Sequence, residues 1–421
     1  MHADFAKEFE SVLSKRLSVV ECAGVGRSRQ QEIHAAMDGR GALGEPADKV
    51  YFRVRSLYLT DDRESWVEHE NGTMAYADAR RNKPHRVPEW RLTYRKENEA
   101  MFAARPGDTV WVARRRREPQ QLLVVVAARG TQIENQLERL LGRAAPTREG
   151  GEFENLGTGG NEAVRTVEDA ELLELLGIAV ETGNVDLERL AAKLSAMGAS
   201  FNDGGWPSTR DFSAACRAVS GGVNPDLDPD AQLVLWFEQT NALFYAFERT
   251  IVQERIDTAF AGMDSIDVDY FLDVAKSVLN ARKSRAGGTF EHHLAALFDA
   301  HRVSFQHLPR RALADGSRPD FVFPEGAVDD GGELRTGAEV LGAKTTLKER
   351  WRQVAGEGSL GPRYVISMDP DLTPTLVTSM LSQCVIPVVA APYIPDSLAD
   401  GGRVWSVRRF IKDVALPASV D

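Results

Sequence analysis

Cysteine and long apolar runs are both scarce in this sequence. Cys22, Cys216 and Cys384 are the only three cysteines in 421 residues, and no two of them stand at a metal-binding spacing. This scarcity predicts a reducing, cytoplasmic location and argues against a structural zinc site. The longest apolar runs, such as Leu122–Ala128, are far too short to cross a bilayer, and the first residues lack the apolar segment of a signal peptide. We therefore expect no membrane partner.

The chain also lacks the positive net charge that many nucleic-acid-binding proteins carry, because its formal charge is −11. Its basic residues are instead concentrated locally. Residues 80–117 hold twelve Lys or Arg against four Asp or Glu, and shorter basic stretches follow at residues 282–285 and 344–352. These stretches predict phosphate-facing surfaces on an otherwise acidic body. The alternative is that each stretch is an ordinary solvated face.

The length predicts two domains with a connection between them, and the first of these has a mixed, β-rich pattern. Alternating or continuous apolar residues predict strands at residues 50–59, 110–113 and 122–127. Apolar residues at helical spacing predict helices at residues 3–20 and 132–141. We predict that residues 1–145 form an N-terminal domain.

A connection and a second domain follow. Residues 146–161 are rich in Gly, Glu and Thr without periodic apolar positions, which is typical of a linker, and amphipathic helices follow to residue 197. We therefore assign residues 146–200 to a linker and helical connection, and residues 201–421 to a catalytic domain. In that domain, helices are predicted at residues 231–256, 268–280 and 289–301, and strands at 321–323, 338–343, 364–368 and 386–390. This alternation predicts an α/β fold with a central mixed sheet flanked by helices.

An acid and a lysine stand at the ends of two of these predicted strands. Asp320 lies in the run Ser-Arg-Pro-Asp-Phe-Val-Phe-Pro, and Lys344 follows 24 residues later at the end of the next strand. Neighbouring strands would bring the carboxylate and the ammonium group to one edge of the sheet. The pattern resembles that of the PD-(D/E)xK nucleases. In those enzymes carboxylates hold Mg²⁺ against the scissile phosphate, and the lysine orients the attacking water.

The second acid of that pattern should stand two residues before the lysine, where this chain has Gly342. We expect Glu357, thirteen residues after Lys344, to replace it. Thr346 and Glu349 resemble a capping box, which predicts a helix from there to about Glu357, ended by Gly358. Residues seven positions apart share a helix face, so Arg350 and Glu357 would lie on the same side. The negative end of the helix dipole near Glu357 favours a cation.

Residues 228–395 resemble the catalytic domain of EcoRII-type restriction endonucleases. The runs that carry the resemblance are Asn280-x-Arg-Lys-Ser-Arg-Ala-Gly287 with Glu291, residues 318–324, residues 343–354 and Ile386-Pro-Val-Val-Ala-Ala-Pro-Tyr393. The resemblance implies a catalytic core of Asp320, Lys344 and Glu357, with Asp320 and Glu357 as Mg²⁺ ligands and Glu291 as a supporting acid. It also implies that Lys348, Glu349 and Arg350 read cytosine–guanine pairs in the major groove. Arg282 and Arg285, in the second basic stretch, are predicted to contact DNA.

The N-terminal domain carries a second, shorter resemblance. Arg81, Asn82, Arg86 and Trp90 resemble the DNA-contacting stretch of the EcoRII effector domain, which has a pseudobarrel fold like that of plant B-three domains. The resemblance implies that this domain binds DNA, and that a second copy of the target there stimulates cleavage. The spacing differs from the family pattern by about one residue.

Together these features predict a type II restriction endonuclease that cuts double-stranded DNA at a palindromic site with CC and GG halves, such as CCWGG. A two-fold target predicts a homodimer, and a separate DNA methyltransferase is expected as its counterpart. The helix near Trp236–Ala242 lacks the arginine-rich stretch of the family, which leaves the central base open. Two alternatives remain: a repair or mobile-element nuclease on the same fold, and a DNA-binding regulator with a decayed nuclease site. For His292 and His293 the sequence leaves two roles open, a structural one and that of a general base.

Overall fold

The structure is a computed structural model that describes residues 1–23, 31–35, 37–83, 85–143, 151–158, 164–182, 185–201, 205–260, 268–309, 311–348, 350–355 and 363–419. The chain divides into two compact units. The N-terminal unit consists of His2–Val164 and Asp169–Glu181, and the C-terminal unit consists of Met1, Arg165–Glu168 and Thr182–Asp421.

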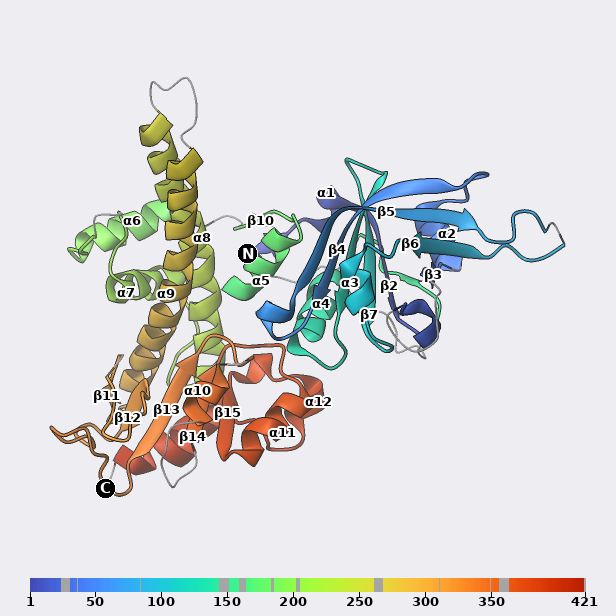
Figure 1. The fold of residues 1–421 in the computed structure, drawn as a ribbon. Helices are drawn as coiled ribbons and strands as arrows, with labels where there is room; N and C mark the ends of the chain where they lie inside the picture. Colours follow the sequence, from blue (N-terminus) through green and yellow to red (C-terminus); the bar gives the residue numbers. More distant parts are fainter. Residues whose placement is uncertain are drawn as a thin grey trace. The chain divides into compact units, whose positions relative to one another are not determined.

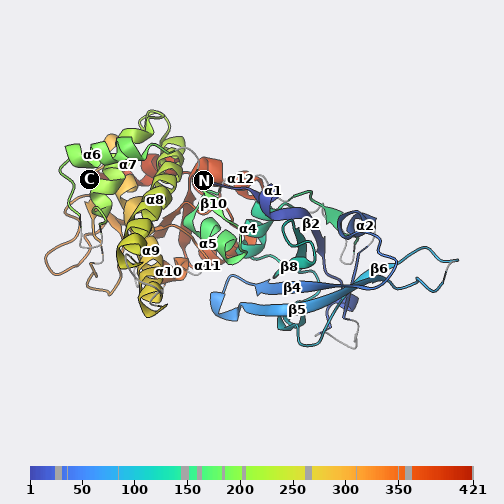
Figure 2. The ribbon, with the colours of Figure 1, turned by 90° about the horizontal axis from the view of Figure 1, so that it is seen from above.

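An eight-stranded sheet in the order β3-β6-β5-β4-β8-β7-β2-β9 forms the N-terminal unit (Figures 1 and 2). Its strands are β2 (Phe9–Arg16), β3 (Glu32–His34), β4 (Val50–Leu59), β5 (Val67–Asp78), β6 (Trp90–Tyr94), β7 (Thr109–Arg115), β8 (Gln121–Ala127) and β9 (Glu154–Asn155). The β4–β8 pair is parallel and the other neighbours are antiparallel. The unit also contains β1 (His2–Ala3), β10 (Val180–Glu181), α1 (Phe5–Glu8), α2 (Met37–Leu43), α3 (Glu99–Ala103), α4 (Gln132–Leu141) and most of α5 (Val167–Leu175).

The predicted strand at residues 50–59 and the predicted helix at residues 132–141 are confirmed as β4 and α4. The predicted continuous helix at residues 3–20 is wrong, because only Phe5–Glu8 is α-helical and strand β2 occupies the eight residues that follow. Strand β2 lies between β7 and β9, and it buries Ser14 and Lys15 as fully as Leu13. These buried polar residues remove the two-residue alternation that marks a strand, so the remaining apolar positions imitate helical spacing.

Part of the predicted linker belongs to the sheet. Within residues 146–161 the structure describes 151–158, where β9 pairs with β2 and Phe153 is buried in the core beside that strand. This segment has only two paired residues and one buried aromatic ring, which are too few positions to produce a periodic pattern in the sequence. Residues 144–150 and 159–163 lie outside the described residues.

A five-stranded mixed sheet in the order β11-β12-β13-β14-β15 is the centre of the C-terminal unit. Its strands are β11 (Gln306–His307), β12 (Phe321–Phe323), β13 (Glu339–Lys344), β14 (Arg363–Ser367) and β15 (Val385–Val389). The first three strands are antiparallel, and β13, β14 and β15 are parallel. All four strands predicted here are confirmed to within about one residue.

Two long helices, α8 (Pro229–Phe260) and α9 (Val268–Ala300), run side by side and pack against this sheet (Figures 1 and 2). The remaining helices are α6 (Leu187–Ala196), α7 (Thr209–Ser220), α10 (Trp351–Ala355), α11 (Pro374–Ser382), α12 (Asp396–Ala399) and α13 (Val407–Phe410). Helix α9 covers two helices that the sequence predicts separately, because it continues through Gly287 and Gly288. No helix among the described residues is long and apolar enough to span a membrane.

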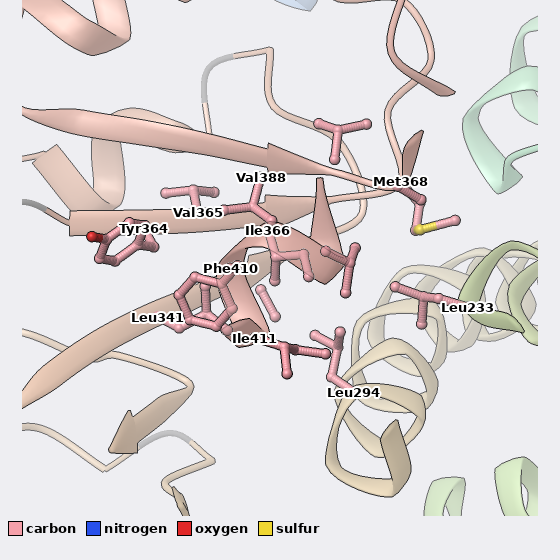
Figure 3. Close-up of a cluster of buried hydrophobic side chains, with 14 of the residues drawn as sticks. Leu233, Leu294, Leu341, Tyr364, Val365, Ile366, Met368, Val388, Phe410 and Ile411 are labelled. Carbon is pink, nitrogen blue, oxygen red and sulfur yellow. The ribbon is translucent and has the colours of Figure 1, made fainter. Parts of the chain in front are cut away.

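The main core of this unit holds the strand ends in place. Figure 3 shows Leu233 of α8 and Leu294 of α9 facing Leu341 of β13 and Ile366 of β14, with Phe410 of α13 in the same cluster. Leu341 and Ile366 are completely buried. Burying a side chain of this size contributes about 1.5–3 kcal/mol. Strand β13 is therefore fixed between its neighbours, and so is the side chain at its end.

A buried ion pair joins β2 to the turn that follows it. Lys15 Nζ lies 2.7 Å from Glu21 Oε1, and both side chains are almost completely buried. The Glu21 carboxylate also accepts hydrogen bonds from the Ser18 and His34 main-chain N–H groups. These extra donors replace the water that the charged carboxylate loses on burial. Without them, burying the charge would cost too much free energy.

We expect Glu21→Ala to lower the free energy of unfolding by about 3–5 kcal/mol, because it leaves the Lys15 ammonium group buried without its partner. Urea unfolding followed by circular dichroism measures the change. The control is Arg53→Ala, which removes a well-exposed ion pair with Glu118 and should cost less than about 1 kcal/mol. Equal losses for the two variants would show that the buried pair is not what stabilises this turn.

Candidate active site

Asp320 and Lys344 meet at one edge of the C-terminal sheet. Asp320 immediately precedes β12, Lys344 ends β13, and the antiparallel register sets Phe321 opposite Leu341. The start of one strand therefore lies beside the end of the other. Asp320 Oδ2 accepts hydrogen bonds from Lys344 Nζ at 3.0 Å and from the Ala343 N–H at 2.6 Å. The predicted juxtaposition of carboxylate and ammonium group is present.

Burial dominates the electrostatics of Asp320. It raises the pKa of the carboxyl above its ordinary value, while Lys344 and the Ala343 N–H oppose this rise by favouring the charged form. The negative charge of Glu291 raises the pKa of Asp320 further. Glu291, on α9, is therefore close enough for the two carboxylates to repel each other, and a cation between them would relieve that repulsion.

These residues line one cavity of about 880 Å³. Helix α9 supplies Ser284, Gly287, Gly288 and Glu291, whose spacing puts them on one helix face. The full lining is Thr209, Ser284, Gly287, Gly288, Glu291, His292, His307, Pro309, Arg318, Asp320, Lys344 and Val354. The cavity is thus open between a helix face with small side chains and a sheet edge with charged ones.

His307, which the sequence did not single out, is bonded to Glu291. His307 Nε2 lies 2.8 Å from Glu291 Oε2, and the imidazole ring stacks on Phe321 with ring centroids 4.8 Å apart. His307 stands on a two-residue strand without any motif around it, so only the pairing of β11 with β12 reveals its position. Arg318 was missed as well, although its place two residues before Asp320 was a usable signal.

The carboxylates present suit a divalent cation. Among the residues that the structure describes, no three His, Cys, Asp or Glu side chains form a group able to hold a metal ion. Mg²⁺ is commonly bound through only one or two carboxylates, with water completing the shell. Asp320 and Glu291 line the same cavity, so this oxygen-only donor set fits such an ion. Glu357, the other predicted ligand, lies outside the described residues.

Gly342 faces the place where the usual second acid would project. A Cβ atom added there would lie 2.9 Å from Val354 Cγ2 of helix α10 and 4.0 Å from Asp320 Oδ2. Helix α10 is held over this position by the Arg363 guanidinium group, which donates to the Val354 carbonyl oxygen. An acidic side chain at residue 342 would therefore collide with Val354, and α10 occupies the space instead.

The predicted helix from Thr346 to Glu357 begins later than expected. Helix α10 starts at Trp351, and Lys348 and Arg350 lie in the turn before it. The Leu347 N–H donates to the buried Asp369 carboxylate at 2.9 Å, which fastens this turn to the end of β14 and keeps it out of the helix. Arg350 therefore lies just before helix α10, and Glu357, its proposed partner on one helix face, lies outside the described residues. Arg350 is exposed and Lys348 partly buried, while Glu349 lies outside the described residues.

Arg282 and Arg285 are engaged inside the unit. The Arg282 guanidinium group donates to both oxygens of the buried Glu248 carboxylate, to Oε1 at 2.9 Å and to Oε2 at 2.7 Å. Arg285 is 8% exposed, stacks over Trp206 at 4.8 Å and donates to the Pro207 carbonyl oxygen. Burial lowers the pKa of Arg285 to about 10. These contacts favour a structural role for both arginines, and DNA contact by them stays a prediction.

The two neighbouring histidines have different surroundings. His293 is completely buried between Thr240 Oγ1 at 2.9 Å and Arg217 Nη1 at 3.1 Å, and burial lowers its pKa well below the ordinary value. A neutral imidazole with two partners and no route to the cavity favours the structural role. His292 lines the cavity, and burial lowers its pKa as well.

The four predicted DNA-contacting residues of the N-terminal unit separate into two groups. Arg81, Asn82 and Arg86 are exposed in the segment between β5 and β6. Trp90, at the start of β6, is 6% exposed and stacks on Tyr76 with ring centroids 5.0 Å apart. Trp90 therefore packs in the core, whereas the other three are available to a ligand.

The clash at Gly342 generates a prediction about stability. Gly342→Ala should lower the free energy of unfolding by about 1–3 kcal/mol, because a stiff β-branched side chain faces the new methyl group. When Val354→Ala is added to Gly342→Ala, the double variant should lose less stability than the sum of the two single losses. Thermal and urea unfolding of the two single variants and the double variant measure the coupling. Strictly additive effects would mean that Val354 does not fill the space beside residue 342.

The family match lies inside the C-terminal unit. Residues 244–408 match the model of the EcoRII C-terminal family. The type II restriction enzyme EcoRII of Escherichia coli is 38% identical over 142 residues, which is 33% of this chain and 33% of the relative. The match thus spans about a third of that enzyme's length.

Solved structures of two restriction endonucleases are also similar. Metal-depleted Ecl18kI in complex with uncleaved DNA gives a TM-score of 0.44 at 18% identity, over 56% of this chain and 86% of that chain. A PspGI–substrate DNA complex gives a TM-score of 0.35 at 14% identity, over 56% of this chain and 92% of that chain. The sequence match therefore carries the assignment: residues 244–408 match the EcoRII C-terminal family, as their motifs predict.

Proposed function

We propose that this protein is a type II restriction endonuclease that hydrolyses phosphodiester bonds in double-stranded DNA. The observation that carries the proposal is the Asp320–Lys344 pair, which opens into a cavity shared with Glu291. This pair lies inside the region that matches the EcoRII C-terminal family. The mixed sheet flanked by helices agrees with a restriction-endonuclease-like fold. For the N-terminal unit we propose a B-three-like pseudobarrel, in agreement with its β-rich sheet.

Mg²⁺ is the proposed cofactor, with Asp320 and Glu357 as its protein ligands and Glu291 as a supporting acid. When bound, such an ion stabilises negative charge on the phosphate and the leaving oxygen and acidifies a bound water. The Ala343 N–H orients Asp320 Oδ2, so the carboxylate faces the cavity in one fixed direction. The position of Asp320 is thus set by the backbone before any ion arrives.

Lys344 positions the attacking water in this proposal. Its ammonium group is held by Asp320 at 3.0 Å, so it presents its other two N–H groups to the cavity. A cation at this place attracts the scissile phosphate and orients a water oxygen toward phosphorus. As the water oxygen bonds to phosphorus, the bond from phosphorus to the leaving oxygen breaks on the opposite side. The water's proton passes to solvent or to a phosphate oxygen, and the leaving oxygen takes up a proton from solvent.

Target recognition is proposed to rest on the turn before α10. Lys348 and Arg350 can donate to guanine O6 and N7, and Glu349 can accept from cytosine N4. This set suits a site with CC and GG halves, such as CCWGG. A two-fold target further suggests that two copies act together as a homodimer.

The N-terminal unit is proposed to bind a second copy of the target and to stimulate cleavage. Its exposed Arg81, Asn82 and Arg86 suit contact with the DNA backbone. A separate methyltransferase is expected to protect the host DNA.

Replacing Asp320, Lys344 or Glu357 by Ala should reduce cleavage of a plasmid carrying CCWGG by at least about a hundredfold. Each change removes a group that stabilises charge in the transition state, so DNA affinity measured by gel shift in Ca²⁺ should remain detectable. Exposed residues of matching type, Glu325→Ala and Lys412→Ala, are the controls. Cleavage at the wild-type rate by Asp320→Ala would refute the site, and fragment ends without a common motif would favour a nuclease of low specificity. A wild-type protein that binds but never cuts would be a regulator.

Gly287 provides a test of whether DNA fills the cavity. A Cβ atom there would meet nothing within 4 Å, so Gly287→Ala should stabilise helix α9 by about 1 kcal/mol. The added methyl group would nevertheless narrow the cavity and slow cleavage. The matched control is Gly41→Ala in α2, which also meets nothing within 4 Å and lies in the other unit. Thermal unfolding and cleavage rates separate the two effects, and full activity of Gly287→Ala would show that no DNA group approaches this face.

A further inference from the structure

Glu291 needs a group that holds it in place. Its side chain lines the same cavity as Asp320 from α9, and its negative charge adds to the rise in the pKa of Asp320 that burial causes. Lys344 is bonded to Asp320. A carboxylate on a flexible side chain beside another carboxylate turns away unless a donor keeps it there.

His307 is positioned to be that donor. An ionised carboxylate only accepts hydrogen bonds, and the 2.8 Å distance lets His307 Nε2 donate to it in the tautomer that carries the proton on Nε2. Both side chains are about one-fifth exposed, at 20% and 19%. The bond is therefore shielded from competing water on most sides, which strengthens it relative to an exposed pair.

The imidazole ring of His307 is itself held rigidly. It stacks on Phe321 with an interplanar angle of 15°, and His292 approaches it edge-on with ring centroids 5.7 Å apart. Phe321 is completely buried and pairs with His307 across β11 and β12. It also follows Asp320 directly in the chain. One strand thus carries Asp320 and supports the ring that holds Glu291.

We propose that His307 is a positioning residue that fixes the Glu291 carboxylate beside Asp320 so that both can serve one divalent cation. The inference rests on the proposed nuclease function and extends it from the acids to the residue that orients one of them. A hydrogen-bonded partner of this kind typically changes metal affinity about 10–100-fold when it is removed. His307 itself touches neither the cation nor the phosphate in this proposal.

Single-turnover cleavage of a CCWGG duplex, measured over a range of Mg²⁺ concentrations, tests the proposal. His307→Ala should raise the Mg²⁺ concentration for half-maximal rate about tenfold. DNA affinity measured in EDTA should stay within about twofold, since no metal takes part. His307→Gln, which keeps an N–H near the position of Nε2, should recover most of the loss. The control is His301→Ala, which removes a histidine just after α9 that contacts the Pro225 carbonyl oxygen and does not line the cavity.

The decisive comparison uses Glu291→Gln as background. If His307 acts through the Glu291 carboxylate, His307→Ala should cause little further change in the Mg²⁺ requirement once that carboxylate is gone. An undiminished effect in this background, or no shift in Mg²⁺ requirement in the wild-type background, would overturn the proposal. Failure of His307→Gln to recover the loss would also count against it, since that points to a packing role for the ring.

A second measurement separates this inference from the nuclease function. Mn²⁺ binding to the full-length protein without DNA, followed by electron paramagnetic resonance, does not depend on cleavage. Affinity should fall in His307→Ala and Glu291→Gln, and no further in the double variant. If the wild-type protein binds Mn²⁺ in this way but cuts no DNA, the nuclease proposal fails and the positioning role stands. Wild-type protein without Mn²⁺ binding, or His307→Ala with wild-type affinity, would refute the positioning role.

Discussion

The antiparallel pairing of β12 with β13 is the constraint on which the candidate site depends. It sets the residue before one strand beside the end of the other, so Asp320 reaches both the Ala343 N–H and the Lys344 ammonium group. The same β12 pairs on its other side with β11, which brings His307 to Phe321 and hence to Glu291. A short strand of three residues therefore organises two carboxylates, a lysine and a histidine around one cavity. The completely buried core behind it makes that arrangement rigid.

Gly342 changes meaning when it is seen in space. In the sequence it is a missing acid, whereas in the fold it is the gap into which Val354 of α10 packs. The helix can approach the strand closely only because residue 342 has no side chain. In our proposal the second metal ligand therefore comes from elsewhere, namely from Glu357, two residues after the end of α10 in the sequence. The absence of an acid at residue 342 therefore goes together with the close packing of α10 against β13.

Burial decides which charged groups of this protein are available at its surface, more than the net charge does. Arg282 and Arg285 belong to a basic stretch, yet one is bound to a buried carboxylate and the other lies between aromatic rings and a carbonyl oxygen. Lys15 is paired in the core of the other unit. The exposed cationic groups lie mainly in the first basic stretch, residues 80–117, where eight of the twelve Lys and Arg side chains are exposed, whereas Arg282 and Arg285 of the second stretch are not. Counting basic residues along the chain therefore overstates the surface available to phosphate, because long cationic side chains also serve as internal supports.

The sequence by itself determined four of the five strands of the C-terminal sheet, β11 being the exception, and the pairing of Asp320 with Lys344. In an α/β domain, a continuous apolar run that ends in a charged residue is typical of a buried strand whose end reaches the edge of the sheet. Only the tertiary structure decided that β2 is a strand, because its buried Ser14 and Lys15 hide the alternation, and that the turn before α10 stays outside the helix, because Asp369 holds it. It alone revealed His307, whose partner Glu291 is 16 residues away on another element. Local patterns record which residues are apolar, but the partner of a polar side chain is set by strand pairing and helix packing, which no short stretch of sequence contains.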